Sequence, residues 1–323
     1  MDRKARIFVA GGDTLVGGAI VRRLRDGDYT AILGEPDLRD PAAVEAFFRE
    51  HRPEYVFLAG GRSGGIGMNR AHPAELMLDN LRIDYAVIDA ARRHGARRLL
   101  YVAPPCVYPR DCPQPMRVEH LLSGPLEPTN EAYAVAKLAG IKLCQACRTE
   151  FGVDFRVGIT ANPYGPGEDF SLENSHVIPA LLRKMHEARE RGAASVEIWG
   201  TGRARREFLF ADDVADGCLC AMRITGGDAI INLGGGSLVS IADLAERIRA
   251  VVGYGGGLRF DASRPDGMPE KTLDGSRLAA AGWSRRTNLD AGLRATYEWY
   301  LSQVADTGPL IQLDRRTGAE AGA

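Results

Sequence analysis

The sequence predicts an α/β fold: a Rossmann-type doubly wound parallel sheet with a smaller C-terminal substrate-binding domain. Short apolar runs alternate with amphipathic stretches through the first half of the chain. These runs are continuously apolar, which is typical of parallel strands that helices cover on both faces. The first run ends at Gly11 and Gly12 and leads directly into a helical pattern, as dinucleotide-binding turns do.

The elements of the first half follow from apolar spacing. In the second expected helix, for example, Val44, Phe47 and Phe48 share one face. We expect strands at Arg6–Ala10, Tyr29–Leu33, Tyr55–Ala59, Leu99–Ala103 and Phe155–Thr160, and helices at Ala19–Arg25, Asp40–His51, Ala74–His94 and Glu131–Phe151.

After Asn162 the regular alternation of apolar runs and amphipathic stretches ends. The second half therefore predicts a smaller domain over the edge of the sheet. Residues 1–165 are expected to form the dinucleotide-binding domain, with returning segments at about 196–225, and residues 166–323 most of the substrate domain. The tail after about residue 306 is polar and glycine-rich, so we expect it to be loose. Further strands are expected at Ser195–Trp199, Arg206–Phe210 and Ile230–Leu233, helices at His176–Arg191, Ala242–Val252 and Asp290–Gln303 with Asp290 as N-cap, and loops at Pro163–Glu173 and Phe260–Lys271.

Composition excludes several classes of function. The 323-residue chain carries a formal net charge of −1, which disfavours a nucleic-acid partner. It contains no apolar run of about 18 residues, so no membrane span is expected. The N-terminus lacks a signal-peptide pattern, and the six cysteines form no secreted disulfide framework, so we expect a cytoplasmic protein. No metal-ligand spacing is present, because Cys144 and Cys147 lie within a helix without a second ligand pair.

The glycine-rich turn predicts a dinucleotide site. Gly11, Gly12 and Gly17 let the backbone approach a pyrophosphate, which then lies on the N-terminus of the following helix. Thr14 stands where the usual pattern has its middle glycine. Its side chain leaves less room for the pyrophosphate to approach the backbone.

Tyr133 and Lys137 are spaced four residues apart in a helical stretch, so both side chains lie on one face. A lysine near a phenol favours the phenolate, which makes the tyrosine a general acid/base near neutral pH. A surface pair has the same spacing, but the position after a fourth strand and a Cys/Pro loop favours catalysis.

Several longer runs together resemble the GDP-L-fucose synthase family, over roughly residues 5 to 303. These enzymes epimerise and reduce GDP-4-keto-6-deoxymannose. The runs are Gly64–Ile66, Leu126–Glu131 leading into Tyr133, Ala139–Cys144, Asn174–Leu182, Trp199–Gly202, Arg206–Phe208, Asp261–Ser263 and Pro265–Gly267.

The resemblance implies roles at matching positions. Tyr133 would give a proton to the 4-keto oxygen, Lys137 would orient the nicotinamide ribose, and Cys106 and His176 would exchange protons at sugar carbons 3 and 5. A thiolate and an imidazole can both move protons near pH 7. The GDP-sugar would contact Lys184, Trp199, Arg206 and Asp266, and the cofactor would contact Gly11, Asp13, Thr14, Leu15, Val16, Gly17, Glu35, Asp37, Leu38, Ala59, Lys137, Asn162 and His176.

The sequence departs from the family pattern in three places. The family loop reads Ser-Ser-Cys-Ile-Tyr-Pro, whereas this chain has Pro104-Pro105-Cys106, which removes the hydroxyl that partners the tyrosine. Asp13 stands where an arginine helps to hold the NADP 2′-phosphate. The run 34–37 after the second strand carries acids and no cation. These acids favour NAD(H), whereas the family expectation is NADP(H).

Three functions remain open. The first is epimerisation and reduction of a GDP-linked 4-keto-6-deoxy sugar; the second is an NAD-dependent nucleotide-sugar epimerase without net redox; the third is a catalytically silent nucleotide-sugar-binding subunit. In relatives the helices that match Ala74–His94 and Glu131–Phe151 form a dimer seam, so a homodimer is expected.

Overall fold

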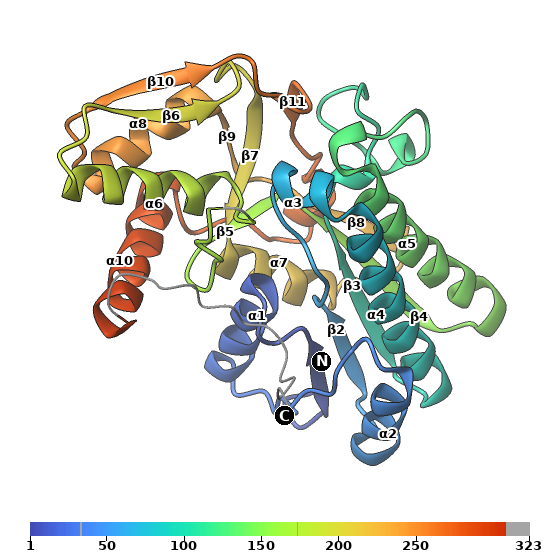
Figure 1. The fold of residues 1–323 in the computed structure, drawn as a ribbon. Helices are drawn as coiled ribbons and strands as arrows, with labels where there is room; N and C mark the ends of the chain where they lie inside the picture. The colour runs from blue at the N-terminus through green and yellow to red at the C-terminus, as the bar shows by residue number, and fades with distance from the viewer. Residues whose placement is uncertain (33, 173, 308–323) are drawn as a thin grey trace, which may run out of the picture.

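A parallel sheet lies at the centre of the computed structural model, which describes residues 1–32, 34–172 and 174–307 (Figure 1). Its order is β1–β2–β3–β4–β8, and the apolar core lines both faces of these strands. This arrangement confirms the predicted Rossmann-type sheet. The strands are β1 Ile7–Ala10, β2 Tyr55–Leu58, β3 Arg98–Ala103, β4 Asp154–Thr160 and β8 Ile230–Leu233.

Helices cover both faces of the sheet (Figure 1). One layer contains α1 (Leu15–Asp26) and α7 (Ala211–Ala221), which pack together. The other contains α2 (Pro41–His51), α4 (Pro73–Arg93) and α5 (Glu131–Phe151), with α4 and α5 side by side.

The expected strand at Tyr29–Leu33 is wrong. The segment makes only an isolated parallel bridge between Ala31 and Ile7, with the Ile32 nitrogen 2.8 Å from the Ile7 oxygen. It runs along the edge of β1 but is too briefly paired to form a strand, because Gly34, with φ +91°, then turns the chain away. Leu33 lies outside the described residues.

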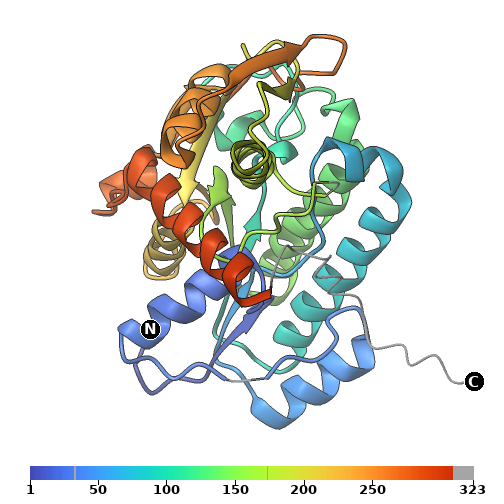
Figure 2. The same cartoon turned by 60° about the vertical axis from the view of Figure 1, so that its left-hand side comes forward.

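A second apolar cluster underlies the C-terminal part. In it, α6 (Val177–Glu190), seen end-on in yellow-green in Figure 2, packs on α8 (Ile241–Val252) and β6 (Ser195–Trp199). The last helix, α10 (Leu289–Thr307), packs on α8 and on β7 (Arg205–Phe210).

Short strands surround this cluster. β10 (Gly257–Asp261) pairs with β6, and β7 lies between β5 (Asn162–Tyr164) and β11 (Glu270–Lys271). β9 (Ser237–Ser240) runs antiparallel to β7. The two segments expected to be loops, 163–173 and 260–271, therefore contain strand residues, because each strand is too short to leave a periodic pattern.

Two expectations about the C-terminal helix change. Asn288, not Asp290, caps α10: its side-chain oxygen accepts the Ala291 N–H at 2.9 Å. Asp290 instead pairs with Arg247 of α8. The helix extends to Thr307, and the expected loose tail beyond it lies outside the described residues.

Buried Glu207 connects the two parts of the chain. Its carboxylate accepts the backbone N–H groups of Gly235, Gly236 and Leu273, each at 2.7 Å. A buried carboxylate needs such donors. Glu207 thereby fixes its neighbour Arg206 relative to the segment that follows β11. No helix in the described part of the chain is both long and apolar enough to cross a membrane.

Candidate active site

The glycine-rich turn joins β1 to α1 and is sterically specified. Gly11 has φ +84°, and a Cβ there would lie 2.4 Å from the Cα of Gly60. At Gly17 a Cβ would lie 1.8 Å from the Gly11 oxygen. Thr14 is the N-cap of α1, since its hydroxyl accepts the Gly17 N–H and donates to the Gly11 oxygen. Thr14 therefore holds the turn together through these two hydrogen bonds, in addition to the expected effect of its side chain on the approach of the pyrophosphate.

Acids line the side of this turn. The Glu35 carboxylate accepts the backbone N–H groups of Gly11 and Gly12. Loss of hydration raises the pKa of Glu35, and the neighbouring charge of Asp13 raises it further. Asp37 forms two 3.0 Å bonds with Arg39, a cation just beyond the acidic run 34–37. Arg39, the cation that directly follows this acidic run in sequence, is thus paired with an acid.

The other predicted cofactor residues lie around the carboxyl ends of β1 to β4, with Asn162 at the start of β5. The side chain of Asn162 donates to the Glu207 backbone oxygen at 2.8 Å. Leu15 and Val16 are the first residues of α1. Ala59 follows β2, and its N–H donates to the Ala10 oxygen. Leu38 is buried and packs against Gly60.

Tyr133 and Lys137 lie one turn apart in α5, as predicted. Burial raises the pKa of Tyr133 well above its usual range, and the nearby Cys106 and Asp84 add to the shift. Lys137 is buried, and its ammonium lies 3.1 Å from an oxygen of Asp84 on α4. Burial thus outweighs any stabilisation of the phenolate by Lys137, whose ammonium is paired with Asp84, and the lowering of the tyrosine's pKa by Lys137 stays a prediction.

Cys106 and His176 approach the site from two loops. Cys106 is buried in the short helix η1 (Pro105–Val107); burial raises its pKa, and Lys271 and Lys137 oppose the shift. His176 precedes α6, is reached by solvent and makes no side-chain cap bond. The protein around its ring lowers the pKa of His176; Asp169 opposes this shift and Lys271 adds to it.

Close backbone contact places the segment before His176. The Gly65 N–H donates to the Asn174 oxygen at 2.9 Å, and a Cβ on Gly65 would lie 2.7 Å from the Ser175 oxygen. Only a glycine permits this approach. The runs 64–66 and 174–182, far apart in sequence, therefore meet just after β2.

The expected substrate residues gather on one side of the C-terminal part. Trp199 is 45% exposed, so it is not a core residue. The Lys184 ammonium lies 5.7 Å from its ring centre, and the Arg264 guanidinium carbon lies 4.9 Å from it. Arg264, which sequence reasoning passed over, thus joins the cations around this ring.

Arg206 and Asp266 contact each other through the backbone. An Arg206 Nη donates to the Asp266 carbonyl oxygen at 3.0 Å, and burial lowers the pKa of Arg206 to about 10. The Asp266 carboxylate accepts the backbone N–H and the hydroxyl of Thr201 at 2.8 and 2.7 Å. Asp266 therefore fixes the turn after Trp199 and orients Arg206.

Sequence reasoning missed Lys271. It stands opposite Arg206 in the parallel register of β11 and β7, so both side chains leave the same face. Burial lowers the pKa of Lys271, while Cys106 and Glu127 oppose that shift. A lysine in a Pro/Gly/charge-rich stretch carries no periodic signal that separates it from a solvated one.

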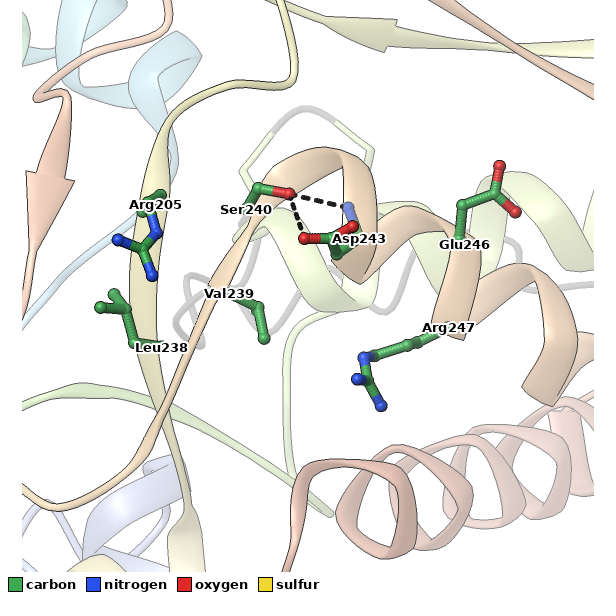
Figure 3. Close-up of a pocket in the computed structure, with 7 residues that line it drawn as sticks. All are labelled: Arg205, Leu238, Val239, Ser240, Asp243, Glu246 and Arg247. Atoms are coloured by element: carbon green, nitrogen blue, oxygen red, sulfur yellow. Dashed lines mark hydrogen bonds between the residues drawn. The ribbon is translucent and has the colours of Figure 1, made fainter.

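A groove of about 470 Å³ lies elsewhere, beside β9 and α8 (Figure 3). Its wall includes Arg205, whose side chain leaves β7 on the face opposite Arg206. Both arginines that line it are paired with acids outside the lining: Arg205 with Glu270 and Arg247 with Asp290. This groove is not part of the site. It is lined by Arg205, Leu238, Val239, Ser240, Asp243, Glu246 and Arg247.

Within the described residues no group of three or more His, Cys, Asp or Glu side chains is arranged to hold a metal ion. The site instead contains buried polar atoms without protein partners, among them Asn80 Oδ1, Asn130 Oδ1 and Ser175 Oγ. Such atoms are suited to bind the hydroxyl and amide groups of a ligand.

Comparison with known proteins agrees with this geometry. Residues 7–234 match the family model described as NAD dependent epimerase/dehydratase family. The chain is 46% identical over 309 residues to GDP-L-fucose synthase 1 of Arabidopsis thaliana, which covers 94% of this chain and 96% of that protein.

Two solved structures are also similar. A GDP-6-OMe-4-keto-L-xylo-heptose reductase from C. jejuni has a TM-score of 0.87 at 31% identity, covering 94% of this chain and 99% of the other. A GDP-L-fucose synthetase from Naegleria fowleri bound to NADP has a TM-score of 0.85 at 25% identity, covering 96% and 98%. The protein is thus an NAD(P)-dependent enzyme, and it belongs to the GDP-L-fucose synthases within the NAD dependent epimerase/dehydratase family.

Proposed function

We propose that the protein epimerises and reduces a GDP-linked 4-keto-6-deoxy sugar. The observation that carries the proposal is the convergence of three groups: η1, which contains Cys106, packs on α5, which carries Tyr133, and the charge of Lys271 affects the pKa of both Cys106 and His176. A site with a phenol donor, a thiol and an imidazole contains groups for both reduction and proton exchange.

The site fits a nicotinamide cofactor. Gly11 and Gly17 let the backbone of the turn pack closely on itself and on Gly60, which leaves the N-terminus of α1 in the arrangement that binds a pyrophosphate in dinucleotide folds. Asn80 Oδ1 and the Lys137 ammonium both border Gly61, where a Cβ would lie 2.6 and 2.8 Å from them, and both are suited to bind ribose hydroxyls. The cofactor, when bound, supplies the hydride for carbon 4.

Proton exchange is the task of Cys106 and His176. A 4-keto group acidifies carbons 3 and 5, so a thiolate and an imidazole can remove and return protons there. Lys271 favours the thiolate of Cys106 and the neutral ring of His176. Both are forms in which a side chain accepts a proton.

Reduction requires a proton at the 4-keto oxygen. Tyr133, whose raised pKa keeps it protonated near neutral pH, is the proposed donor. We further propose that Lys184, Trp199 and Arg206 hold the GDP, with the exposed indole as a face for the base and the guanidinium near a phosphate.

The finer cofactor choice follows from Glu35 and Asp13, and we propose NAD(H). A carboxylate at this position can accept the 2′-OH of NAD, but it repels a 2′-phosphate. Arg39 is bonded to Asp37, so a 2′-phosphate would have to displace an acid to reach it.

Pro104 favours a second candidate, a nucleotide-sugar epimerase without net redox. Proline offers neither a hydroxyl nor an N–H to the reacting oxygen. Such an enzyme would keep its cofactor through the cycle and would need no added reductant. The catalytically silent binding subunit is set aside, because the chain belongs to a family of enzymes.

We also propose a homodimer that forms through α4 and α5. Leu78 and Tyr85 of α4 and Val135 of α5 are apolar or aromatic and exposed on the outer side of this helix pair. Apolar groups on adjacent helices mark an interaction surface more often than scattered ones do.

The test is incubation with GDP-4-keto-6-deoxymannose and NADH or NADPH in deuterated water. Mass spectrometry is expected to find deuterium at carbons 3 and 5 and a reduced sugar, with equimolar oxidised cofactor. Deuterium without reduction would favour the epimerase. The absence of both signals would contradict the proposed substrate.

A further inference from the structure

Arg264 lies over the exposed Trp199 ring and has no role in the proposed reaction so far. Its guanidinium carbon is 4.9 Å from the ring centre. Among the residues that the structure describes, none accepts a hydrogen bond from this guanidinium, and its ion-pair partner Asp261 lies 3.6 Å from Nε. Arg259 of β10, by contrast, donates to Glu197 at 3.1 Å. The donors of Arg264 are therefore free to bind a ligand.

One backbone oxygen fixes Arg264 relative to this ring. Trp199, the last residue of β6, stands opposite Asp261, the last residue of β10, in the register of the two strands. The Asp261 carbonyl oxygen accepts the Gly200 N–H at 2.9 Å and the Arg264 N–H at 3.1 Å. The Asp261 carboxylate also accepts the N–H and the hydroxyl of Ser263, at 3.0 and 2.6 Å. The turn after β10 thus brings Arg264 back to the indole at the end of β6.

The same turn continues to the residue proposed to lie near a phosphate. Two residues after Arg264, the Asp266 carbonyl oxygen accepts an Arg206 Nη at 3.0 Å. The side chain of Arg264 is 52% exposed, whereas Arg206 is partly buried. A nucleoside diphosphate likewise has a flat base at one end and charged phosphates at the other. Arg264 and Trp199 therefore lie at the end that suits the base.

An arginine at the base end can distinguish one base from another. Its planar guanidinium stacks on an aromatic face and still presents N–H groups at its edge. Guanine has two neighbouring acceptors, O6 and N7, which a guanidinium binds with two hydrogen bonds. Adenine has one acceptor, N7, beside the N6 donor, and uracil has no N7. A lysine ammonium is a point charge without this fork of donors.

We propose that Arg264 determines base specificity: lying over Trp199, its guanidinium binds O6 and N7 of guanine and so favours GDP-linked substrates over ADP-linked or UDP-linked ones. This inference rests on the proposed function, in which the Trp199 indole holds the base and Arg206 lies near a phosphate. A phosphate contact adds affinity for any nucleoside diphosphate, whereas a contact to the base edge selects among them. Arg206 thus supplies affinity, and Arg264 supplies the selection.

The test compares four nucleotides and needs no turnover. Calorimetry measures the affinity of the full chain for GDP, IDP, ADP and UDP. IDP keeps O6 and N7 but lacks the 2-amino group of guanine, so it isolates the edge that Arg264 binds. The unchanged chain should bind GDP and IDP about tenfold more tightly than ADP and UDP. Arg264→Met should weaken GDP and IDP by about tenfold and leave ADP and UDP nearly unchanged.

Two further variants separate charge from shape and local from general effects. Arg264→Lys keeps a cation near Trp199 but not the fork of donors, so it should lose the preference for GDP and IDP as Arg264→Met does. Arg249→Met is the matched control, since it removes an exposed guanidinium from α8, where Arg249 pairs with Glu246. It should change none of the four affinities.

Several results would overturn the proposal. An equal loss for all four nucleotides in Arg264→Met would show that Arg264 contacts the phosphates, and four unchanged affinities would show that it contacts no nucleotide. An unchanged chain that binds none of the four, or binds IDP no better than ADP, would also reject selection through O6 and N7.

Turnover then separates the role of Arg264 from the proposed reaction. A base preference that depends on Arg264, in a chain that converts no GDP-4-keto-6-deoxymannose, would support the role of Arg264 and reject the proposed function. A chain that converts this sugar and keeps its base preference in Arg264→Met would support the proposed function and reject the role of Arg264.

Discussion

The carboxylate of Glu35 accepts the backbone N–H of Gly11, the glycine that opens the turn after β1. In a dinucleotide fold this position borders the adenosine ribose. The acid is fixed there by a second bond from Gly12 and is not free to swing away without losing both donors. The proposed preference for NAD(H) therefore rests on the same contact that closes the turn.

This contact predicts tighter binding of NAD(H) than of NADP(H). Glu35→Gln should keep the shape and remove the charge, so the affinity for NADPH should rise about tenfold, which corresponds to about 1.4 kcal/mol. Calorimetry of both cofactors against both proteins measures this. Glu50→Gln, a change at an exposed glutamate of α2, should alter neither affinity. Equal or tighter binding of NADPH by the unchanged chain would contradict the prediction.

Lys271 predicts a pH effect on proton exchange. Lys271 opposes the burial-raised pKa of Cys106, so Lys271→Met should raise that pKa further. Exchange that needs the Cys106 thiolate should then begin at higher pH. Its rate at neutral pH should fall about tenfold for each pH unit by which the midpoint rises. Deuterium uptake by the substrate, followed across pH, measures the change.

The control for this prediction is Lys271→Arg, which keeps the positive charge and should restore most of the exchange rate. A deuterium-uptake profile in Lys271→Met that keeps its midpoint and loses only amplitude would argue that Lys271 binds substrate without acting on Cys106.

The α4–α5 surface predicts a dimer that one charge disrupts. Tyr85 is 55% exposed in the single chain, and burying a carboxylate at its place in a seam is strongly unfavourable. Tyr85→Glu should shift the mass found by light scattering to that of one 35.0 kDa chain. Leu301→Glu, at an exposed leucine of α10, should leave the dimer intact. If the unchanged chain is a monomer at micromolar concentration, the proposed dimer interface through α4 and α5 is wrong.

The sheet and the Tyr133–Lys137 pair were predictable because each leaves a pattern in the sequence. Continuous apolar runs mark β1 to β4, and a spacing of four residues places two side chains on one helix face. The described residues 29–32 pair only briefly along the edge of β1, which the apolar composition of the segment does not reveal. Asp84 and Lys271 were missed since a single charged residue in a helix or loop gives no sign of burial, and their partners are 53 and 65 residues away.

Pro104 carries the last prediction. A carbonyl that is being reduced develops negative charge on its oxygen, and losing one donor to that oxygen typically lowers the rate by about 10²–10³. Pro104 stands where the resemblance places a serine, so the proposed donor Tyr133 would act without that hydroxyl. Proton exchange passes through an enolate at the same oxygen, but reduction must also deliver a proton to it. We therefore expect the unchanged chain to exchange substrate protons with deuterated water faster than it reduces the ketone.

Pro104→Ser should raise reduction more than exchange. Pro104 has φ −82° and ψ 161°, an extended conformation that serine adopts without strain, and the η1 turn bonds from Val107 and Tyr108 involve backbone atoms only. Pro104→Ala is the matched control, because it releases the ring without adding a hydroxyl. Reduction that rises in the serine variant but not in the alanine variant identifies the missing donor as the limit. If both variants fold and reduce no faster than the unchanged chain, the sugar must be positioned so that its oxygen does not face residue 104.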